Sequence, residues 1–368
     1  MIELNIFSII LILGIVQGVF LVVSLFLIRN RNKGANQFLS AFILLITLTM
    51  LGRLIIESDL EISFPNILAL PDAIIFLYGP IMYLYLLKLC TNREFKFAKT
   101  IKHFLPAIIF LVSELPLLFQ IDHQFRETWT RYTTVRFILI EGGALVVNIY
   151  YLFLYKNLLN TYEDESNNHF SIRQHPKYLR VISNIMAVTL IVWGVSYFSW
   201  ITGNYNIFSQ IGYRTVWIIL PFLTYAFGYY AMNQPALFKV INKKEKPNTD
   251  TQIDQSVLED WKKTLEKFML EEMPYLNPNL TLKMLSDDIG LKPYQTSKLI
   301  NTVYEKNFND FINGYRIEEF KKRATADGLK KKTILSFALE AGFNSKTTFN
   351  TAFKKLTNTT PLQYLKSR

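Results

Sequence analysis

The stretch from Leu4 to Ile28 reads LNIFSIILILGIVQGVFLVVSLFLI, and none of its side chains is charged. At about 1.5 Å per residue, a helix of this length spans a hydrocarbon layer about 30 Å thick. No basic residue precedes the stretch, and no small-residue cleavage pattern follows it. We therefore interpret it as a retained membrane helix and not as a signal peptide that is removed.

Six further apolar runs follow within the first two thirds of the chain. They lie near residues 37–56, 70–89, 103–120, 135–155, 181–203 and 213–232. One such run can be a buried core helix of a soluble protein, but seven in series predict a membrane bundle, and backbone groups in lipid must be satisfied within helices. We expect an all-α protein whose residues 1–235 form a seven-helix transmembrane domain with its first helix near 4–28. The fourth run is the least regular, because Pro106, Glu114 and Pro116 interrupt it.

Basic residues are concentrated in alternate loops, after the first, third and fifth runs. These loops contain Arg29, Arg31, Lys33, Lys88, Arg93, Lys96, Lys99, Lys102, Lys156, Arg173, Lys177 and Arg180. The opposite loops contain only Arg126, Arg131 and Arg214. The excess of Lys and Arg in cytoplasmic loops predicts a multi-pass protein of a bacterial inner membrane, with its N-terminus outside and its C-terminal domain in the cytoplasm.

The composition indicates two environments and gives no sign of an enzyme. Half of the residues are hydrophobic, yet the formal net charge is +11, and the chain from Tyr275 onward is basic. A basic cytoplasmic module is typical of a protein with an anionic partner. Cys90 is the only cysteine, which excludes an internal disulfide and zinc sites with two or more thiolates. The four histidines show no metal-ligand spacing, and no Ser-His set or glycine-rich phosphate loop is present, so we expect no cofactor, no metal and no catalytic activity.

Residues 236–274 are expected to form a linker followed by an amphipathic helix. The polar segment 242–255 contains Pro247, and the helix from Ile253 to Glu272 places Leu258, Trp261, Leu265 and Phe268 on one face. This face either packs on its own domain or forms a dimerising coiled coil, for which fewer than three heptads are available.

Two helix-turn-helix patterns follow from Leu280 onward. In the first, Gly290 suits a left-handed helix end and Pro293 can start the next helix, which we expect to bury Leu299 and Val303. In the second, Gly342 ends a short helix, and Ser345 is a good N-cap for a helix with Phe349 and Phe353 in the core. Between them, the helix from Phe308 to Ala324 is expected to bury an apolar stripe. Its surface charges are expected to be Arg316, Lys321, Lys322 and Arg323.

Residues 275–366 resemble the AraC/XylS-type transcription regulators. The densest match runs from Ala341 to Tyr364 and reads AGFNSKTTFNTAFKKLTNTTPLQY; the stretch Asn307 to Arg316, NFNDFINGYR, also resembles the family's connecting helix, particularly in Bacteroidetes-type forms with multi-pass membrane domains. The resemblance implies that residues 275–368 are a DNA-binding domain with two helix-turn-helix units that read successive major-groove segments. Three positions depart from the family pattern, namely Thr296, Asn358 and Leu365. Asparagine at position 358 tolerates a left-handed turn. Leu365 stands at a position where an arginine can contact phosphate, and Thr296 stands where an apolar residue usually packs the first unit.

The resemblance also implies which side chains face DNA. The expected base-facing residues are Tyr294, Ser297, Lys298, Lys346, Thr347, Asn350 and Thr351. Asparagine can pair with adenine and lysine can reach guanine, while Lys354 and Lys355 are expected on phosphates. Lys330 to Lys332 is interpreted as a solvated loop. The partners expected are promoter DNA, membrane lipid, RNA polymerase and a second copy of the chain.

Four ionisable residues lie in the outer half of the expected membrane helices: Arg53, Glu114, Arg136 and Glu141. Because such groups are costly in lipid, they form either structural ion pairs or a pocket for a small polar ligand, and the sequence leaves both open. The function predicted is a membrane-bound transcription regulator that couples a signal at the bundle to promoter binding. The alternative is a membrane receptor or transporter whose C-terminal domain recruits a protein.

Overall fold

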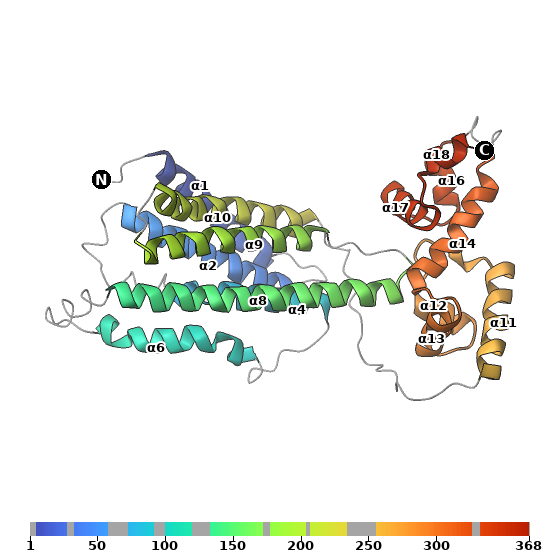
Figure 1. Cartoon of the computed structure of the whole chain (residues 1–368), viewed down its shortest axis with the longest axis horizontal. Coiled ribbons are helices and arrows are strands. Elements are labelled where there is room, and N and C mark those ends of the chain that lie inside the picture. Colours follow the sequence, from blue (N-terminus) through green and yellow to red (C-terminus); the bar gives the residue numbers. More distant parts are fainter. Residues whose placement is uncertain are drawn as a thin grey trace. The chain divides into compact units, whose positions relative to one another are not determined.

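The structure, a computed structural model, describes residues 5–27, 33–57, 73–91, 100–119, 133–171, 177–203, 207–233, 255–325 and 332–367. All regular elements in these ranges are helices, which confirms the all-α class. The chain forms two compact units (Figure 1). One contains residues 1–160 and 176–240, which we call the apolar unit. The other contains residues 161–175 and 241–368, which we call the C-terminal unit.

The apolar unit is a helical bundle. Its helices are α1 (Ile6–Leu27), α2 (Lys33–Glu57), α4 (Tyr78–Cys90), η3 (Ile101–Phe104), α6 (Leu105–Phe119), α8 (Thr133–His169), α9 (Lys177–Ile201) and α10 (Ile207–Asn233). Helix α1 packs against α2 and α10, α10 packs against α9, and α2 packs against α4. Close approach needs small residues. A Cβ atom added at Gly18 would lie 2.1 Å from Thr47 Oγ1, and one at Gly14 would lie 2.8 Å from Pro221 Cγ.

Four helical segments in the described ranges are long and apolar enough to cross a membrane, judged by length and composition. They are Ile6–Leu27, Lys33–Glu57, Phe137–His169 and Tyr178–Ile201. The seventh apolar run lies within α10. The third and fourth runs form shorter described helices, of 13 residues in α4 and 15 in α6. The seven-span topology therefore stays a prediction. Helix α8 continues 14 residues beyond the expected end of the fifth run at Tyr155.

A break in the third apolar run precedes the Tyr78-Gly79-Pro80 motif. Residues 75–77 form a turn, α4 begins at Tyr78, and Pro80 lies in its first turn, where its missing N–H is tolerated. Asn148 of α8 satisfies the backbone groups at the break. Its Oδ1 accepts from Gly79 N at 2.8 Å, and its Nδ2 donates to Ile75 O at 2.8 Å. A polar side chain in an apolar run thus stabilises irregular backbone inside the bundle.

The C-terminal unit contains α11 (Gln255–Glu271), η4 (Pro274–Leu276), α12 (Leu282–Asp288), α13 (Pro293–Val303), α14 (Phe308–Arg323), α16 (Ile334–Glu340), α17 (Lys346–Thr357) and α18 (Pro361–Lys366). Helix α14 serves two apolar cores. Phe311 and Ile312 belong to the core around α12 and α13, whereas Ile317 and Phe320 belong to the core around α16 and α17. One helix therefore connects the two halves of the unit.

The amphipathic helix α11 packs on its own unit. Leu265 is fully buried in the first core, and Leu258, Trp261 and Phe268 pack against it. Its apolar face is therefore used within the chain, which favours the first of the two interpretations from sequence. Arg316, by contrast, contradicts the expectation of a surface charge, because its side chain is fully buried. Four hydrogen bonds from its guanidinium to oxygen atoms compensate for its burial.

Candidate nucleic-acid interface

The first helix-turn-helix unit has the expected turn and helix starts. Thr281 caps α12 by accepting a hydrogen bond from Met284 N at 3.2 Å, and Gly290 adopts the left-handed conformation with φ +71°. Pro293 is the first residue of α13, as predicted. Leu299 is buried, but Val303 is exposed and Ile300 takes its place in the core, so the prediction for Val303 was wrong.

Thr296 is part of a buried polar contact in the first unit. Its side chain is fully buried, and its Oγ1 accepts a hydrogen bond from Ser286 Oγ at 2.9 Å. Ser286 Oγ also lies 2.7 Å from Leu282 O. The hydroxyl of Thr296 therefore has a partner within the core, and α13 packs closely on α12 despite the absence of an apolar residue at this position.

The second unit is built on a core of aromatic rings. Phe349 and Phe353 of α17 are buried, as predicted, and their ring centroids lie 5.6 Å apart. Ser345 caps α17 by accepting from Thr348 N at 3.2 Å, which confirms it as the N-cap. Asn358 ends α17 with φ 57°, so asparagine adopts the left-handed turn here.

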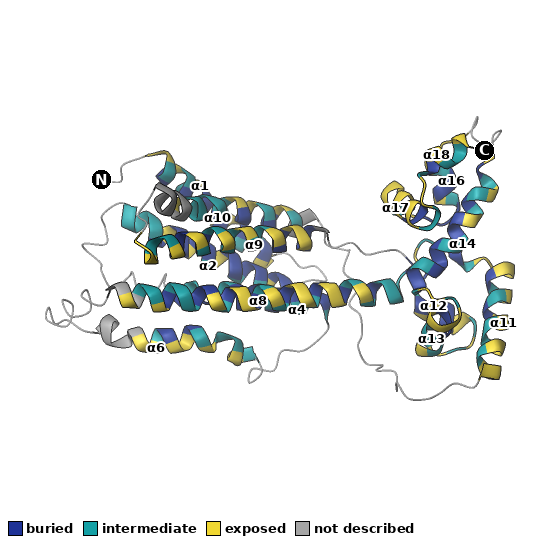
Figure 2. Cartoon of the chain, in the orientation of Figure 1, coloured by how far each residue is buried: buried dark blue, intermediate teal, exposed yellow. Residues whose placement is uncertain are grey.

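The exposed face of α17 carries the residues expected on DNA. Lys346, Thr347, Asn350, Thr351 and Lys354 are all exposed. Helix α17 is thus exposed on this face and buried on the face that carries its phenylalanines (Figure 2). Three of these residues, Lys346, Asn350 and Lys354, also line a surface cleft of about 600 Å³ with residues of α16 and α18. A polar helix face with amide and ammonium groups can hydrogen-bond base edges and phosphates.

The corresponding face of α13 is less exposed. Tyr294 is exposed, whereas Ser297 and Lys298 are half-buried. The two candidate faces therefore differ in how much side chain they offer to a partner.

Lys354 and Lys355 have different surroundings. Lys355 Nζ pairs with Asp310 Oδ2 of α14 at 2.5 Å, and the Asp310 side chain is mostly shielded from solvent. Lys354 instead lines the cleft beside Asn350. No local pattern predicts this difference, because Asp310 lies 45 positions from Lys355 in the sequence. Lys354 is the better candidate for a phosphate contact.

The four ionisable residues of the apolar unit do not form one described site. Arg53 pairs with Glu57 one turn away, and its guanidinium lies 5.8 Å from the ring centroid of Trp217. Glu141 Oε2 accepts a hydrogen bond from Trp193 Nε1. The side chains of Glu114 and Arg136 lie outside the described residues.

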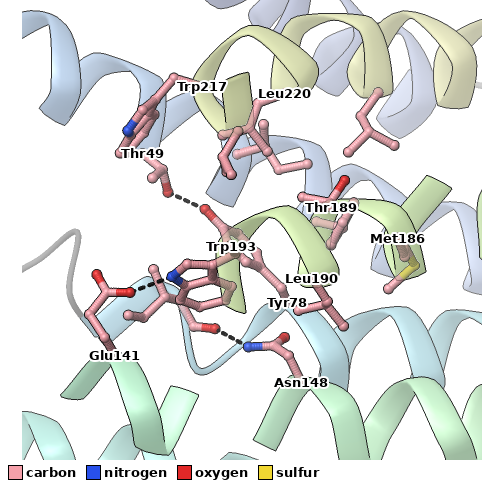
Figure 3. Close-up of a pocket in the computed structure, with 15 residues that line it drawn as sticks. Thr49, Tyr78, Glu141, Asn148, Met186, Thr189, Leu190, Trp193, Trp217 and Leu220 are labelled. Atoms are coloured by element: carbon pink, nitrogen blue, oxygen red, sulfur yellow. Dashed lines mark hydrogen bonds between the residues drawn. The ribbon is translucent and has the colours of Figure 1, made fainter. Parts of the chain in front are cut away.

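Glu141 borders a cavity of about 120 Å³ in the apolar unit (Figure 3). Thr49, Tyr78, Asn148 and Trp193 also line it, and the hydroxyls of Thr49 and Tyr78 lie 2.5 Å apart. The other lining side chains are apolar or weakly polar: Phe42, Ile46, Ile75, Met186, Thr189, Leu190, Val216, Trp217, Leu220 and Leu223. From the sequence we expected Glu141 at a possible ligand pocket, but not Thr49, Tyr78 or Asn148. Their available signal was that each is a polar side chain within an apolar run. Among the described residues, no cluster of three metal-ligating side chains is present.

Comparison with known proteins gives one family match, which lies in the C-terminal unit, and several similar proteins. Residues 285–367 match a family described as a helix-turn-helix domain. An uncharacterized HTH-type transcriptional regulator of Pseudoalteromonas carrageenovora is 33% identical over 93 residues, which are 25% of this chain and 52% of that protein. Uncharacterized HTH-type transcriptional regulators of Staphylococcus aureus strains MSSA476 and N315 are each 33% identical over 90 residues, which are 24% of this chain and 12% of theirs. The chain thus spans about an eighth to a half of the length of these relatives, and no solved structure matches it.

Proposed function

We propose that this protein is a membrane-bound, sequence-specific DNA-binding transcription regulator of the AraC type. The observation that carries the proposal is the pair of helix-turn-helix units joined by α14, of which the second presents Lys346, Asn350 and Lys354 on one exposed face. The match of residues 285–367 to a helix-turn-helix domain and the HTH-type regulators among its relatives support it. In this proposal, α13 and α17 are the recognition helices.

The apolar unit supports a membrane location for the protein. Large hydrophobic side chains are exposed on its helices, among them Phe20, Phe153 and Phe198, each more than 60% exposed. Exposed residues follow α6, α8 and α9 along their length (Figure 2). A water-exposed domain rarely carries so much uncovered apolar surface, whereas lipid covers it without cost. We propose seven spans, an outside N-terminus and a cytoplasmic C-terminal unit, in accord with the distribution of basic loops.

The signal is proposed to act in the cavity beside Glu141. Glu141 is the one carboxylate among the described side chains that line the cavity, and the rest of this described lining is mostly apolar. A small molecule with an apolar body and a single cationic or hydrogen-bond-donating group fits this chemistry. The ligand can bias transcription only through its different affinity for two states of the bundle.

The test of DNA binding uses the full chain in lipid nanodiscs. Fragments of the source genome are selected on the protein, and the enriched fragment and a shuffled duplex of equal length are titrated by fluorescence anisotropy across salt concentrations. We expect at least about a thousandfold preference for the enriched fragment, with affinity falling steeply as salt rises. Equal affinity for both duplexes would overturn the proposal and favour the alternative in which the C-terminal unit recruits a protein.

The membrane topology is tested separately in cells. A reporter that is active only in the cytoplasm is fused after Arg368, and a second fusion places a reporter active only in the periplasm at the same position. Activity of the periplasmic reporter alone would overturn the proposed orientation, because the C-terminal unit could not then reach the chromosome.

The cavity is tested with Glu141→Gln, which keeps the shape of the side chain and removes its charge. We expect the transcriptional response to the stimulus to be lost while the amount of protein in the membrane is unchanged. Glu57→Gln is the control, since it alters a carboxylate of the apolar unit that does not line the cavity. A fall in protein amount with Glu141→Gln would show a structural role and contradict the ligand site.

A further inference from the structure

The C-terminal unit contains a short segment from an earlier part of the chain. Residues 161–171, at the end of α8 and just beyond it, group with the helix-turn-helix units and not with the rest of α8. Phe170 forms an antiparallel bridge with Thr281, the N-cap of α12. Ser171 N donates to Leu280 O at 3.2 Å. The segment therefore pairs, through one isolated bridge, with the backbone of the residues that lead into the first helix-turn-helix unit.

Two side chains of α14 hold the same segment. Asn309 Nδ2 donates to Ser171 O at 2.9 Å and to Phe170 O at 3.3 Å. Asn309 is buried, and its Oδ1 accepts from Asn313 Nδ2 at 3.0 Å. The amide of Asn309 is thus oriented by its own helix, with its donor directed at the carbonyls of the segment.

Arg316 completes the site. It donates from Nη1 to Ser171 O at 3.1 Å and from Nη2 to Ser171 Oγ at 3.1 Å. It also donates from Nε to Tyr275 O at 2.7 Å and from Nη2 to Asn277 O at 2.8 Å. Burial lowers the pKa of Arg316 to about 10, so the guanidinium stays charged at neutral pH. Ser171 supplies two of its four acceptors, and a buried charge is stable only while such acceptors are present.

The site lies where the two halves of the C-terminal unit meet. The guanidinium carbon of Arg316 lies 5.9 Å from the ring centroid of Phe343, which follows the turn of the second unit. At that turn, a Cβ atom added at Gly342 would lie 2.3 Å from Tyr275 O, one of the acceptors of Arg316. Ser171 is fully buried at this junction. Ser171 thus contacts a residue that leads into the first unit and two residues of α14, and one of these, Arg316, also contacts Phe343 of the second unit.

We propose that the junction of the two helix-turn-helix units is a peptide-binding site, that its ligand is the chain's own segment Phe170–Ser171, and that occupancy of this site controls promoter affinity. The inference rests on the proposed function. Helix α8 carries both the cavity residues Glu141 and Asn148 and, at its end, the bound segment. The cavity residues and the bound segment are therefore connected covalently through one helix, and a conformational change at the cavity can be transmitted along it. Release of the segment loosens the fixed spacing that two recognition helices need to read one promoter.

The test uses the full chain in nanodiscs with Ser171→Trp, whose indole cannot fit at a fully buried serine. We expect amide exchange at Phe170, Ser171 and Thr281 to rise at least about tenfold, and affinity for the selected promoter fragment to fall about tenfold, within the usual range of coupling between sites. Affinity for the shuffled duplex stays unchanged. The matched control is His169→Trp, which introduces the same indole at an exposed position two residues earlier and is expected to change neither quantity.

Ser171→Ala provides a milder variant that removes one acceptor of Arg316 and keeps the backbone contacts. We expect a smaller change in the same direction, which tests the site even where Ser171→Trp does not fold. Rapid exchange of Ser171 in the unaltered protein would overturn the docked segment. Increased or unchanged promoter affinity in both variants, with exchange raised, would overturn the regulatory role. Absence of promoter preference in the unaltered protein would instead remove the proposed function, while the exchange data still decide whether the segment binds.

Discussion

The two helix-turn-helix units differ in the side chains through which their helices pack. In the first, α12 and α13 meet across a buried hydroxyl contact between Ser286 and Thr296. In the second, α17 packs through phenylalanine rings, with Phe320 and Phe349 centroids 4.6 Å apart. The core of the second unit therefore consists mainly of packed aromatic rings. The first unit adds a buried hydrogen bond to its apolar core, and the segment from α8 also contacts the residues that lead into it.

The largest effect is expected from Phe353→Ala in the second unit. This ring is fully buried, and its removal leaves a cavity that α17 cannot close, at a cost of about 3 to 5 kcal/mol. Amide exchange of α17 in the full chain measures the loss, and promoter binding should disappear with it. Phe353→Leu, which retains most of the volume, is the control and should cost about 1 kcal/mol. Unchanged protection of α17 in Phe353→Ala would contradict the idea that the aromatic core holds the recognition face.

The next effect separates base contacts in the two units. Asn350→Ala should cost about 1 to 3 kcal/mol at the promoter and relax the preference for one base, as expected for loss of a bidentate pair. Ser297→Ala, on the less exposed face of α13, should cost less. Selection of binding sites from a random duplex pool measures both preferences. A larger change in base preference for Ser297→Ala than for Asn350→Ala would show that the first unit contributes most to base recognition.

A smaller effect distinguishes the two neighbouring lysines at the end of α17. Lys354→Ala should weaken all duplexes alike and lower the slope of log affinity against log salt by about 1, because one phosphate contact is lost. Lys355→Ala should leave that slope unchanged, since this lysine pairs with Asp310. Titrations at several salt concentrations measure both slopes. Equal losses of slope would show that Lys355 leaves Asp310 for a phosphate.

The smallest effect is expected from Thr296→Val in the first unit. The substitution keeps the volume and removes one hydroxyl, while Ser286 Oγ retains Leu282 O as its acceptor at 2.7 Å. Stability should therefore change by less than about 1 kcal/mol, because no buried donor is left without a partner. Amide exchange of α13 measures this change. A loss of several kcal/mol would show that the hydroxyl contact is as important to the first unit as the phenylalanine rings are to the second.

The sequence by itself determined the local structure of both units. The apolar spacing, the N-cap at Ser345, and the left-handed turns at Gly290 and Asn358 each depend on residues a few positions apart. Helix periodicity and backbone preferences act over that same short range, so they can be read from the chain directly. The exposed face of α17 follows in the same way, because Phe349 and Phe353 fix which side of the helix is buried.

Only the tertiary structure decided which charged and polar side chains are buried and which partners they have. Arginine is usually a surface residue, but Arg316 is buried and its acceptors include Ser171, 145 positions earlier. Lys355 likewise pairs with Asp310, which lies 45 positions earlier in the sequence. A long polar side chain is stable on a surface or in a core, and the choice depends on whether oxygen atoms from distant segments surround it. Local sequence patterns contain no information about hydrogen-bond partners from distant segments. The site at the junction of the two helix-turn-helix units is therefore visible only in the tertiary structure.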